Sequence, residues 1–252
     1  MNGSGCDLLC ISPHTDDAEI ALGGTLRLLA DQGRQVWACD LTAGELASNA
    51  DPQTRWQEAT VASEILGLTG RVQLALPDGW IDAGAPPQVD AVVAILRMLR
   101  PRWVVTAPAA HRHPDHLATP PLVRRAVFLA RLPALEVVAP AARWWPAPPD
   151  RQPTAAWITP VVGETCPDGT EPDLLIDVSS TWDAKQRALA CYRSQFQREP
   201  GRVPTAINDP AFLAEVGARA GRWGRRAGCS HAEALCLQAV PVVTDLPDGR
   251  WA

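Results

Sequence analysis

Short apolar runs alternate with longer stretches of mixed polarity through the first half of the chain, and this alternation predicts its secondary structure. The apolar runs have the length of strands, and the stretches between them are long enough for helices. Gly33, Gly67 and Pro101 stand where three of the helical stretches are expected to end. The predicted strands are residues 7–12, 35–41, 72–76 and 103–106, and the predicted helices are residues 18–33, 55–66, 88–99 and 117–132.

Strands that alternate with helices indicate a parallel sheet covered by helices on both faces. We therefore expect a Rossmann-like, three-layer α/β fold with a mainly parallel sheet, formed by a single domain over residues 1–252. Residues 133–160 are rich in proline and tryptophan and lack periodicity, so we expect them to form a long excursion within this domain. A later strand is predicted at residues 173–178, and later helices at residues 181–196 and 211–227.

Composition and charge exclude several classes of protein. The chain has 252 residues and a formal net charge of -5, so it offers no basic surface for nucleic acid or for an anionic membrane. No apolar run approaches the roughly 20 residues of a membrane span, and the apolar run near the N-terminus is typical of a strand and not of a signal peptide. Seven cysteines are scattered without a C-x-x-C pair, as free thiols are in a reducing compartment. We expect a cytoplasmic protein without a nucleic-acid or membrane partner.

Two polar clusters follow predicted strands. Residues 13–17, with the sequence PHTDD, follow the first strand, and residues 111–116, with the sequence HRHPDH, follow the fourth. Ligands of such folds bind beyond the carboxyl ends of the strands, near a point where the strand order reverses. We therefore expect both clusters at the C-terminal edge of the sheet, where they would form an active site.

The residue types in the two clusters suit a catalytic metal. A histidine and a carboxylate from the first cluster, with a histidine from the second, would supply the three protein ligands of a zinc site whose fourth position holds water. A second carboxylate beside that water would act as a general base. His113 is placed to stabilise the oxyanion that forms during attack on an amide, and Asp115 would orient one of its neighbouring histidines.

Alternatives to a catalytic zinc site stay open at this point. Ferrous iron, cobalt or manganese would also suit the ligand set. Paired aspartates at a helix start also serve as caps, and single histidines are often structural. Asp40 follows the second strand as a ribose-binding acid would, but no G-x-G-x-x-G follows the first strand, and no G-x-S-x-G indicates a serine hydrolase.

Two further features allow two interpretations each. Gly23 and Gly24 fall inside a predicted helix, where they indicate either a close approach by another element or a break in the helix. Arginines between residues 219 and 226 have partly helical spacing. They would form a solvated helix face or help to bind an acidic substrate.

The residues of the two clusters resemble the LmbE-like, or PIG-L, family of deacetylases. Residues 12–19, with the sequence SPHTDDAE, and GGT at residues 23–25 are similar to the family signature A-H-P-D-D-x-E-x-x-x-G-G-T, and residues 113–116 match its second motif, H-P-D-H. Further similarity is to the branch that deacetylates N-acetylglucosaminyl malate in bacillithiol biosynthesis. It extends through residues 39–46, 55–59, 65–67 and 76–79, and near the C-terminus through stretches that contain Lys185, Tyr192, Ser194-Gln195 and Ala232-Glu233.

The resemblance implies the ligands and the acid–base residues. The residues that would bind one zinc ion per chain are His14, Asp17 and His116. Asp16 would be the general base. His113, supported by Asp115, would stabilise the oxyanion or act as the general acid.

The resemblance also implies how the substrate is held. Arg55 would contact sugar hydroxyls, and so, on weaker similarity, would Asp78. A further arginine would come from the excursion, as either Arg143 or Arg151. The family resemblance implies a homo-oligomer, often a hexamer in this branch.

Two departures from the family pattern affect this expectation. Thr15 stands where the family usually has proline, at a position that carries no ligand. His231 stands where the branch usually has tyrosine, near the expected substrate pocket.

These observations predict a metal-dependent N-deacetylase that acts on a small amino-sugar substrate. The expected reaction is zinc-dependent hydrolysis of the N-acetyl group of an N-acetylglucosaminyl conjugate, with the malate conjugate as first candidate, to give acetate and the free amine. One alternative is a deacetylase or amidase of the same family that acts on a thiol S-conjugate or an antibiotic intermediate. The other is a metal- or sugar-binding protein without turnover.

Overall fold

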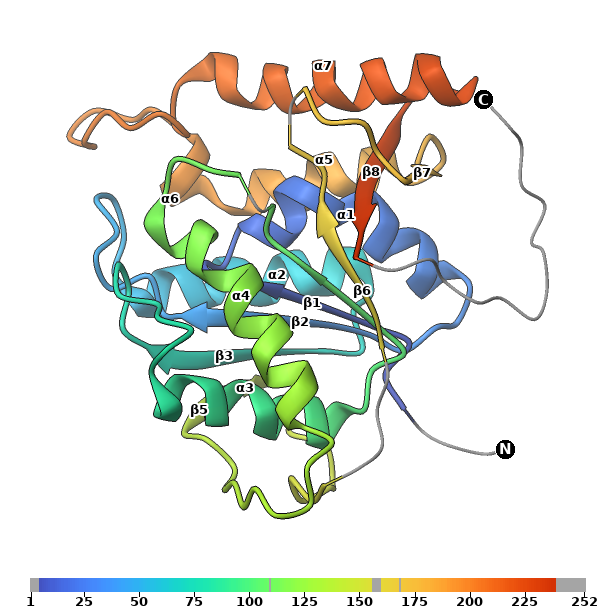
Figure 1. Ribbon diagram of the computed structural model, residues 1–252. Helices are drawn as coiled ribbons and strands as arrows, with labels where there is room; N and C mark the ends of the chain where they lie inside the picture. The colour runs from blue at the N-terminus through green and yellow to red at the C-terminus, as the bar shows by residue number, and fades with distance from the viewer. Residues whose placement is uncertain (1–4, 109, 156–159, 168, 239–252) are drawn as a thin grey trace.

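A single mixed sheet runs through the computed structural model, which describes residues 5–108, 110–155, 160–167 and 169–238. Its strands are β1 (Leu8–Ser12), β2 (Val36–Thr42), β3 (Gly70–Leu76), β4 (Trp103–Thr106), β5 (Ala142–Trp145), β6 (Val161–Thr165), β7 (Leu174–Asp177) and β8 (Ala232–Leu237). They lie in the order β5-β3-β2-β1-β4-β6-β8-β7 (Figure 1). The five strands from β3 to β6 are mutually parallel, whereas β5, β8 and β7 pair antiparallel with their neighbours. The predicted α/β fold with a mainly parallel sheet is confirmed.

Helices cover both faces of this sheet. They are α1 (Asp17–Asp31), α2 (Pro52–Leu66), α3 (Pro86–Leu99), α4 (Pro114–Leu129), α5 (Trp182–Cys191), α6 (Arg193–Phe196) and α7 (Pro210–Ala227). Side chains alternate between the two faces of a strand, so Leu9 and Ile11 of β1 join the core beneath α3 and α4, while Leu8 and Cys10 join the core beneath α1, α2 and α5. The α7 helix packs along β8, at the end of the sheet opposite β5 (Figure 1).

The chain changes direction between β1 and β4, which are neighbours in the sheet. From β1 the chain moves to β2 and β3 on one side, and from β4 it moves to β6 on the other. The loops that follow β1 and β4 therefore leave the sheet next to each other, at the C-terminal ends of parallel strands. These loops carry the two polar clusters found in the sequence.

The second half of the chain differs most from prediction. The expected excursion over residues 133–160 contains β5, and its residues 156–159 lie outside the described part of the chain. Strands β6 and β8 were not predicted, and the single helix expected at residues 181–196 is divided into α5 and α6 at Tyr192. The single domain predicted for residues 1–252 includes two terminal segments, 1–4 and 239–252, that are also outside the described residues.

The two glycines of α1 allow other elements to approach closely. The helix continues unbroken from Asp17 to Asp31. A Cβ atom added at Gly24 would lie 2.6 Å from Cβ of Val178, and one added at Gly23 would lie 2.9 Å from Cγ of Lys185. The close-approach interpretation is therefore correct, and the helix-break interpretation is wrong.

All seven cysteines fall in the described part of the chain, and all are free thiols. Among the described helices, none combines the length and the apolar character that crossing a bilayer requires.

Candidate active site

Buried hydrogen bonds hold the loop between β1 and α1 at the residue that precedes its two aspartates. The backbone carbonyl of Thr15 accepts hydrogen bonds from Nη2 of Arg71, at 2.5 Å, and from the hydroxyl of Tyr192. Asp16 then caps α1, and Asp17 is its first residue. Carboxylates are stabilised at a helix N-terminus by the exposed backbone amides and the helix dipole. The loop is thus fixed at Thr15, directly before its two aspartates.

Arg71 is the cation under this loop. Its guanidinium is fully buried and donates to both carboxylate oxygens of Asp40, at 2.7 and 2.8 Å, and to Glu19 at 2.6 Å. A buried charge is tolerated only when it is paired and hydrogen-bonded. Asp40 is therefore a structural partner of Arg71. This agrees with the absence of a G-x-G-x-x-G motif, which argued against a role for Asp40 in binding ribose. An arginine inside a buried strand was the one sequence signal for this network.

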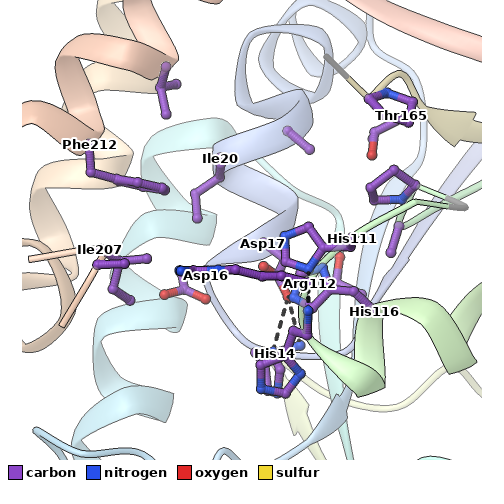
Figure 2. A pocket seen from close by; sticks show the side chains of 18 of the residues that line it. His14, Asp16, Asp17, Ile20, His111, Arg112, His116, Thr165, Ile207 and Phe212 are labelled. Atoms are coloured by element: carbon purple, nitrogen blue, oxygen red, sulfur yellow. Dashed lines mark hydrogen bonds and ion pairs between the residues drawn. The ribbon is translucent and has the colours of Figure 1, made fainter. Parts of the chain in front are cut away.

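Three side chains from the two loops converge as a metal-binding group. His14, Asp17 and His116 each offer a ligand atom, and these atoms lie within 4.8 Å of one another. Oδ2 of Asp17 is 3.4 Å from Nδ1 of His14 and 3.3 Å from Nε2 of His116 (Figure 2). Tetrahedral ligands with bonds of about 2.0–2.2 Å lie about 3.3–3.6 Å apart. Both distances to Asp17 thus match the separation of ligands around a zinc ion, and the ligand atoms of His14 and His116 lie within 4.8 Å of each other.

The second nitrogen of His14 is held by carboxylates. Nε2 lies 3.0 Å from Oδ1 of Asp78 and 3.5 Å from Oδ2 of Asp115. Metal-binding histidines commonly donate their other N–H to a carboxylate, which fixes the ring and the tautomer. Burial lowers the pKa of His14, but its contacts with Asp115, Asp17 and Asp78 outweigh burial and raise that pKa to about 12. Without a metal, these carboxylates therefore favour the protonated form of His14.

Asp78 has contacts that differ from those of a sugar ligand. One of its carboxylate oxygens meets His14, and the other accepts a hydrogen bond from the backbone N–H of Leu46 at 3.0 Å. Burial raises the pKa of Asp78, but the His14 and Leu46 contacts lower it to about 2. Both oxygens are engaged, so the geometry supports positioning of His14 in place of the predicted sugar contact.

Asp115, predicted to support His113, lies close to both His113 and His14, with a carboxylate oxygen within 4.8 Å of a ring nitrogen of each. Its carboxylate accepts hydrogen bonds from the backbone N–H groups of Gly79, at 2.7 Å, and Ile81, at 3.2 Å, and approaches His14. The backbone N–H of Asp115 donates a hydrogen bond to Nδ1 of His113 at 3.2 Å. That contact leaves the proton of a neutral His113 on Nε2. Burial and the neighbouring histidines lower the pKa of His113, which favours this neutral, N–H-donating form.

His111 is a site residue to which the sequence analysis gave no role. Its ring stacks on His116 with centroids 3.9 Å apart, and its Nδ1 accepts a hydrogen bond from the backbone of His113. Burial, followed by the charge of His116, lowers the pKa of His111 to about 4. A neutral ring thus fixes one face of the candidate ligand His116. Its position two residues before the H-P-D-H motif was the only sequence signal.

Asp16 and Arg55 form a buried pair beside the ligand group. Nη2 of Arg55 lies 3.3 Å from Oδ1 of Asp16, and the two residues are 4% and 3% exposed. Nε of Arg55 has no hydrogen-bond partner among the described residues. Gly44 gives this arginine its room, since a Cβ there would lie 2.1 Å from Nη1. Arg55 therefore holds Asp16 and lines the pocket, while its Nε is buried without a partner among the described residues.

A pocket of about 900 Å³ extends from these residues. Figure 2 shows Ile207 and Phe212 on the side away from His116, with Ile20 between the two sides. Neither of the arginines predicted from the excursion is among its lining residues: Arg143 contacts the start of α2, and Arg151 donates to the backbone of Met98. The described arginines that line the pocket are Arg55, Arg112 and Arg219.

Comparisons with known proteins agree with this geometry. Residues 9–127 match the PIG-L family, described as GlcNAc-PI de-N-acetylase. A "Probable N-acetyl-alpha-D-glucosaminyl L-malate deacetylase 2" of Bacillus cereus is 31% identical over 201 residues, which cover 75% of this chain and 83% of that protein. A 1D-myo-inositol 2-acetamido-2-deoxy-alpha-D-glucopyranoside deacetylase of Rhodococcus erythropolis is 25% identical over 261 residues, covering 83% of this chain and 87% of that protein. The crystal structure of a conserved protein from Thermus thermophilus is 32% identical, with a TM-score of 0.78 over 98% of this chain and 100% of that one.

Proposed function

Because this chain belongs to the PIG-L family of N-deacetylases, which hydrolyse amide bonds, we propose that it removes the N-acetyl group from an N-acetylglucosaminyl conjugate with the help of a zinc ion. The observation that carries the proposal is the convergence of three ligand-type side chains with a further carboxylate, Asp16, beside them. A protein that only bound a metal or a sugar would need no such carboxylate. The products would be acetate and the free amine.

The donor set supports zinc as the metal. His14, Asp17 and His116 would hold it, with Asp78 and Asp115 behind His14. When bound, zinc supplies Lewis-acid chemistry, which makes water easier to deprotonate near neutral pH and polarises the acetamide carbonyl. Metal analysis of protein purified without added metal distinguishes zinc from ferrous iron, cobalt and manganese.

Asp16 and His113 would carry the proton and charge movements. Asp16 would accept a proton from the attacking water and return it to the departing amine, and Arg55 would keep this carboxylate in position. Neutral His113, with its proton on Nε2, would donate a hydrogen bond to the oxyanion. Of its two predicted roles, this tautomer favours the oxyanion donor over the general acid.

The sugar of the proposed substrate would lie against Arg55, which lines the pocket beside Asp16. By similarity to named relatives alone, the malate conjugate is the first candidate, because the Bacillus cereus relative is named for it. The myo-inositol conjugate is the second, because the Rhodococcus relative is named for that substrate. Thiol S-conjugates and antibiotic intermediates complete the set of substrates to compare. We place the reaction in the cytoplasm, in a homo-oligomer, as parts of the same proposal.

Acetate release from these substrates by the zinc-loaded protein tests the proposal. We expect Asp16→Asn to lower kcat on the order of 10²- to 10⁴-fold while the zinc content stays the same, because a general base contributes that much to rate. Asp82→Asn, which changes an exposed aspartate outside the pocket, is the matched control. Full activity of Asp16→Asn would remove the general base from the mechanism. Binding without acetate release from any substrate would favour the non-catalytic alternative.

A further inference from the structure

The pocket has an arm that leads away from the candidate metal ligands along α1. Ile20 and Ala21 line it about one helical turn beyond Asp17, and Lys185 and Glu233 line its far end, next to Gly24. Seven residues separate Asp17 from Gly24, which is about 10 Å along a helix. The arm therefore begins at the reacting centre and extends beyond it.

One face of α7 forms the opposite wall of this arm. Phe212, Val216, Arg219 and Trp223 line the pocket at intervals of four, three and four residues, so they share one side of the helix. The ring of Phe212 stacks on Phe196, with centroids 5.8 Å apart and planes within 11°. With Ile20 on the facing helix, the middle of the arm is apolar on two sides. An apolar wall suits an aryl or alkyl group better than it suits sugar hydroxyls, which would lose hydrogen bonds there.

At the far end of the arm, the carboxylate of Glu233 pairs with Lys185 and has no oxygen left for a second cation. Glu233 already accepts hydrogen bonds from Nζ of Lys185 at 2.6 Å, from the backbone of Gly24 at 3.0 Å, and from the backbone and hydroxyl of Thr25 at 2.8 and 2.6 Å. Its oxygens are therefore occupied within the fold.

Arg219 is the additional cation. It is half-buried, and it has no hydrogen bond or ion pair with any described residue. Glu215, one helical turn before it, does not pair with it either. Burial lowers the pKa of Lys185, and the charge of Arg219 lowers it further, so the two cations lie close enough to repel each other. An anion bound at Arg219 would relieve that repulsion and supply the missing partner.

We propose that this arm binds the aglycone of the N-acetylglucosaminyl conjugate, an inference that rests on the proposed function. The aglycone has an apolar body that carries an acidic group, and this group pairs with Arg219. The apolar body lies between Ile20 and the Phe212 face of α7, and the acid reaches the end of the arm. The substrate-binding role predicted for Arg143 or Arg151 thus passes to a residue of α7. Arg219 acts as a specificity-determining residue.

A series of N-acetylglucosaminides with methyl, phenyl, 4-carboxyphenyl and malyl aglycones tests the proposal, each as both anomers. We expect kcat/KM to rise from methyl to phenyl and again to 4-carboxyphenyl, and we expect 4-carboxyphenyl to exceed malyl. A charged hydrogen bond of the usual strength makes the 4-carboxyphenyl substrate on the order of tenfold to a hundredfold better than the phenyl substrate. In Arg219→Gln that ratio falls to about one, chiefly through KM, and in Arg219→Lys part of it is retained.

Arg225→Gln is the matched control, because it changes an exposed arginine of the same helix outside the pocket and keeps the ratio. An unchanged ratio in Arg219→Gln overturns the anion site. A malyl substrate better than 4-carboxyphenyl overturns the apolar body. Calorimetric binding of the same substrates gives a readout without turnover, so a failure of the proposed deacetylation is distinguishable from a failure of the aglycone site.

Discussion

His14 is the residue on which the geometry of the site depends most. One ring nitrogen faces Asp17 and the candidate metal position, and the other faces Asp78 and Asp115. The ring is thus oriented by carboxylates on both sides. A change in any of them should alter metal binding before it alters contacts with the substrate.

Asp78→Asn tests whether this carboxylate positions the ligand or binds the sugar. We expect the variant to lose about 10- to 100-fold in zinc affinity, the usual effect of removing a carboxylate behind a ligand histidine. Competition with a chromophoric chelator measures this affinity, and Asp82→Asn is the control. A normal zinc affinity with a raised KM would instead support the sugar contact predicted from the sequence.

The stability of the chelator-stripped protein should pass through a maximum near pH 6.5. His14, with its pKa raised to about 12, binds a proton that the unfolded chain releases near pH 6.5. Its contribution is complete below that pH and is lost as the pH rises towards 12. His111, with its pKa lowered to about 4, is neutral in the fold while the unfolded chain is protonated, so its contribution is lost as the pH falls from about 6.5 to 4.

Thermal unfolding of stripped protein between about pH 5 and pH 9 measures this profile. In His14→Asn the decline above about pH 6.5 should disappear. A melting temperature that does not change with pH in the stripped wild-type protein would contradict the protonated His14.

At the level of single residues, the sequence predicted the groups that carry motifs and missed those that support them. The side chains predicted as ligands meet because their loops follow adjacent parallel strands. Arg71 and His111 were given no role and Asp78 was given a sugar contact, because their actual contacts exist only after distant strands and loops have come together. The contact of Asp115 with His14, across two loops, was unpredictable for the same reason.

At the level of elements, the predictions held where the chain alternates regularly and failed where it does not. The four strands predicted in the first half lie within about two residues of those observed. Alanine, glycine and glutamate in the sequences of β5, β6 and β8 have low strand propensity. Pairing with neighbouring strands, and the packing of α7 on β8, stabilise them. No local sequence pattern predicts that pairing.

Gly24→Ala should destabilise the protein although alanine favours helices. An exposed helical glycine costs roughly 1 kcal/mol relative to alanine, but here the new Cβ would lie 2.6 Å from Val178. We expect a loss of about 1–3 kcal/mol in the free energy of unfolding, as for other overpacked sites. Chemical denaturation measures it. Gly221→Ala in α7, with only a flexible arginine tip 3.9 Å away, should be neutral or stabilising, and a stabilising Gly24→Ala would refute the close approach.

At the level of the whole molecule, large apolar side chains remain exposed near α4. Leu117 and Phe128 are 45% and 56% exposed, and they lie eleven residues apart, about three turns along one side of this helix. Trp80, in the loop that follows β3, is 73% exposed. Apolar surface of this kind is commonly covered by another chain.

We predict that the protein self-associates and that Phe128→Glu lowers the assembly's mass. A charge placed in an apolar interface is costly unless it is paired. Sedimentation equilibrium measures the mass, and Val138→Glu, at a side chain 84% exposed outside α4, serves as the control. A wild-type protein that sediments as a monomer would contradict the prediction.

The distribution of the site along the chain has an evolutionary consequence. Every residue proposed for metal binding or proton transfer precedes residue 117, within the part that matches the family, whereas the α7 wall of the pocket arm comes after it. Mutations in α7 can therefore change which conjugates are accepted, while the residues proposed for hydrolysis are inherited unchanged. Selection can act on the two parts separately, so that descendants of one ancestral hydrolase diversify in their substrates and keep their chemistry.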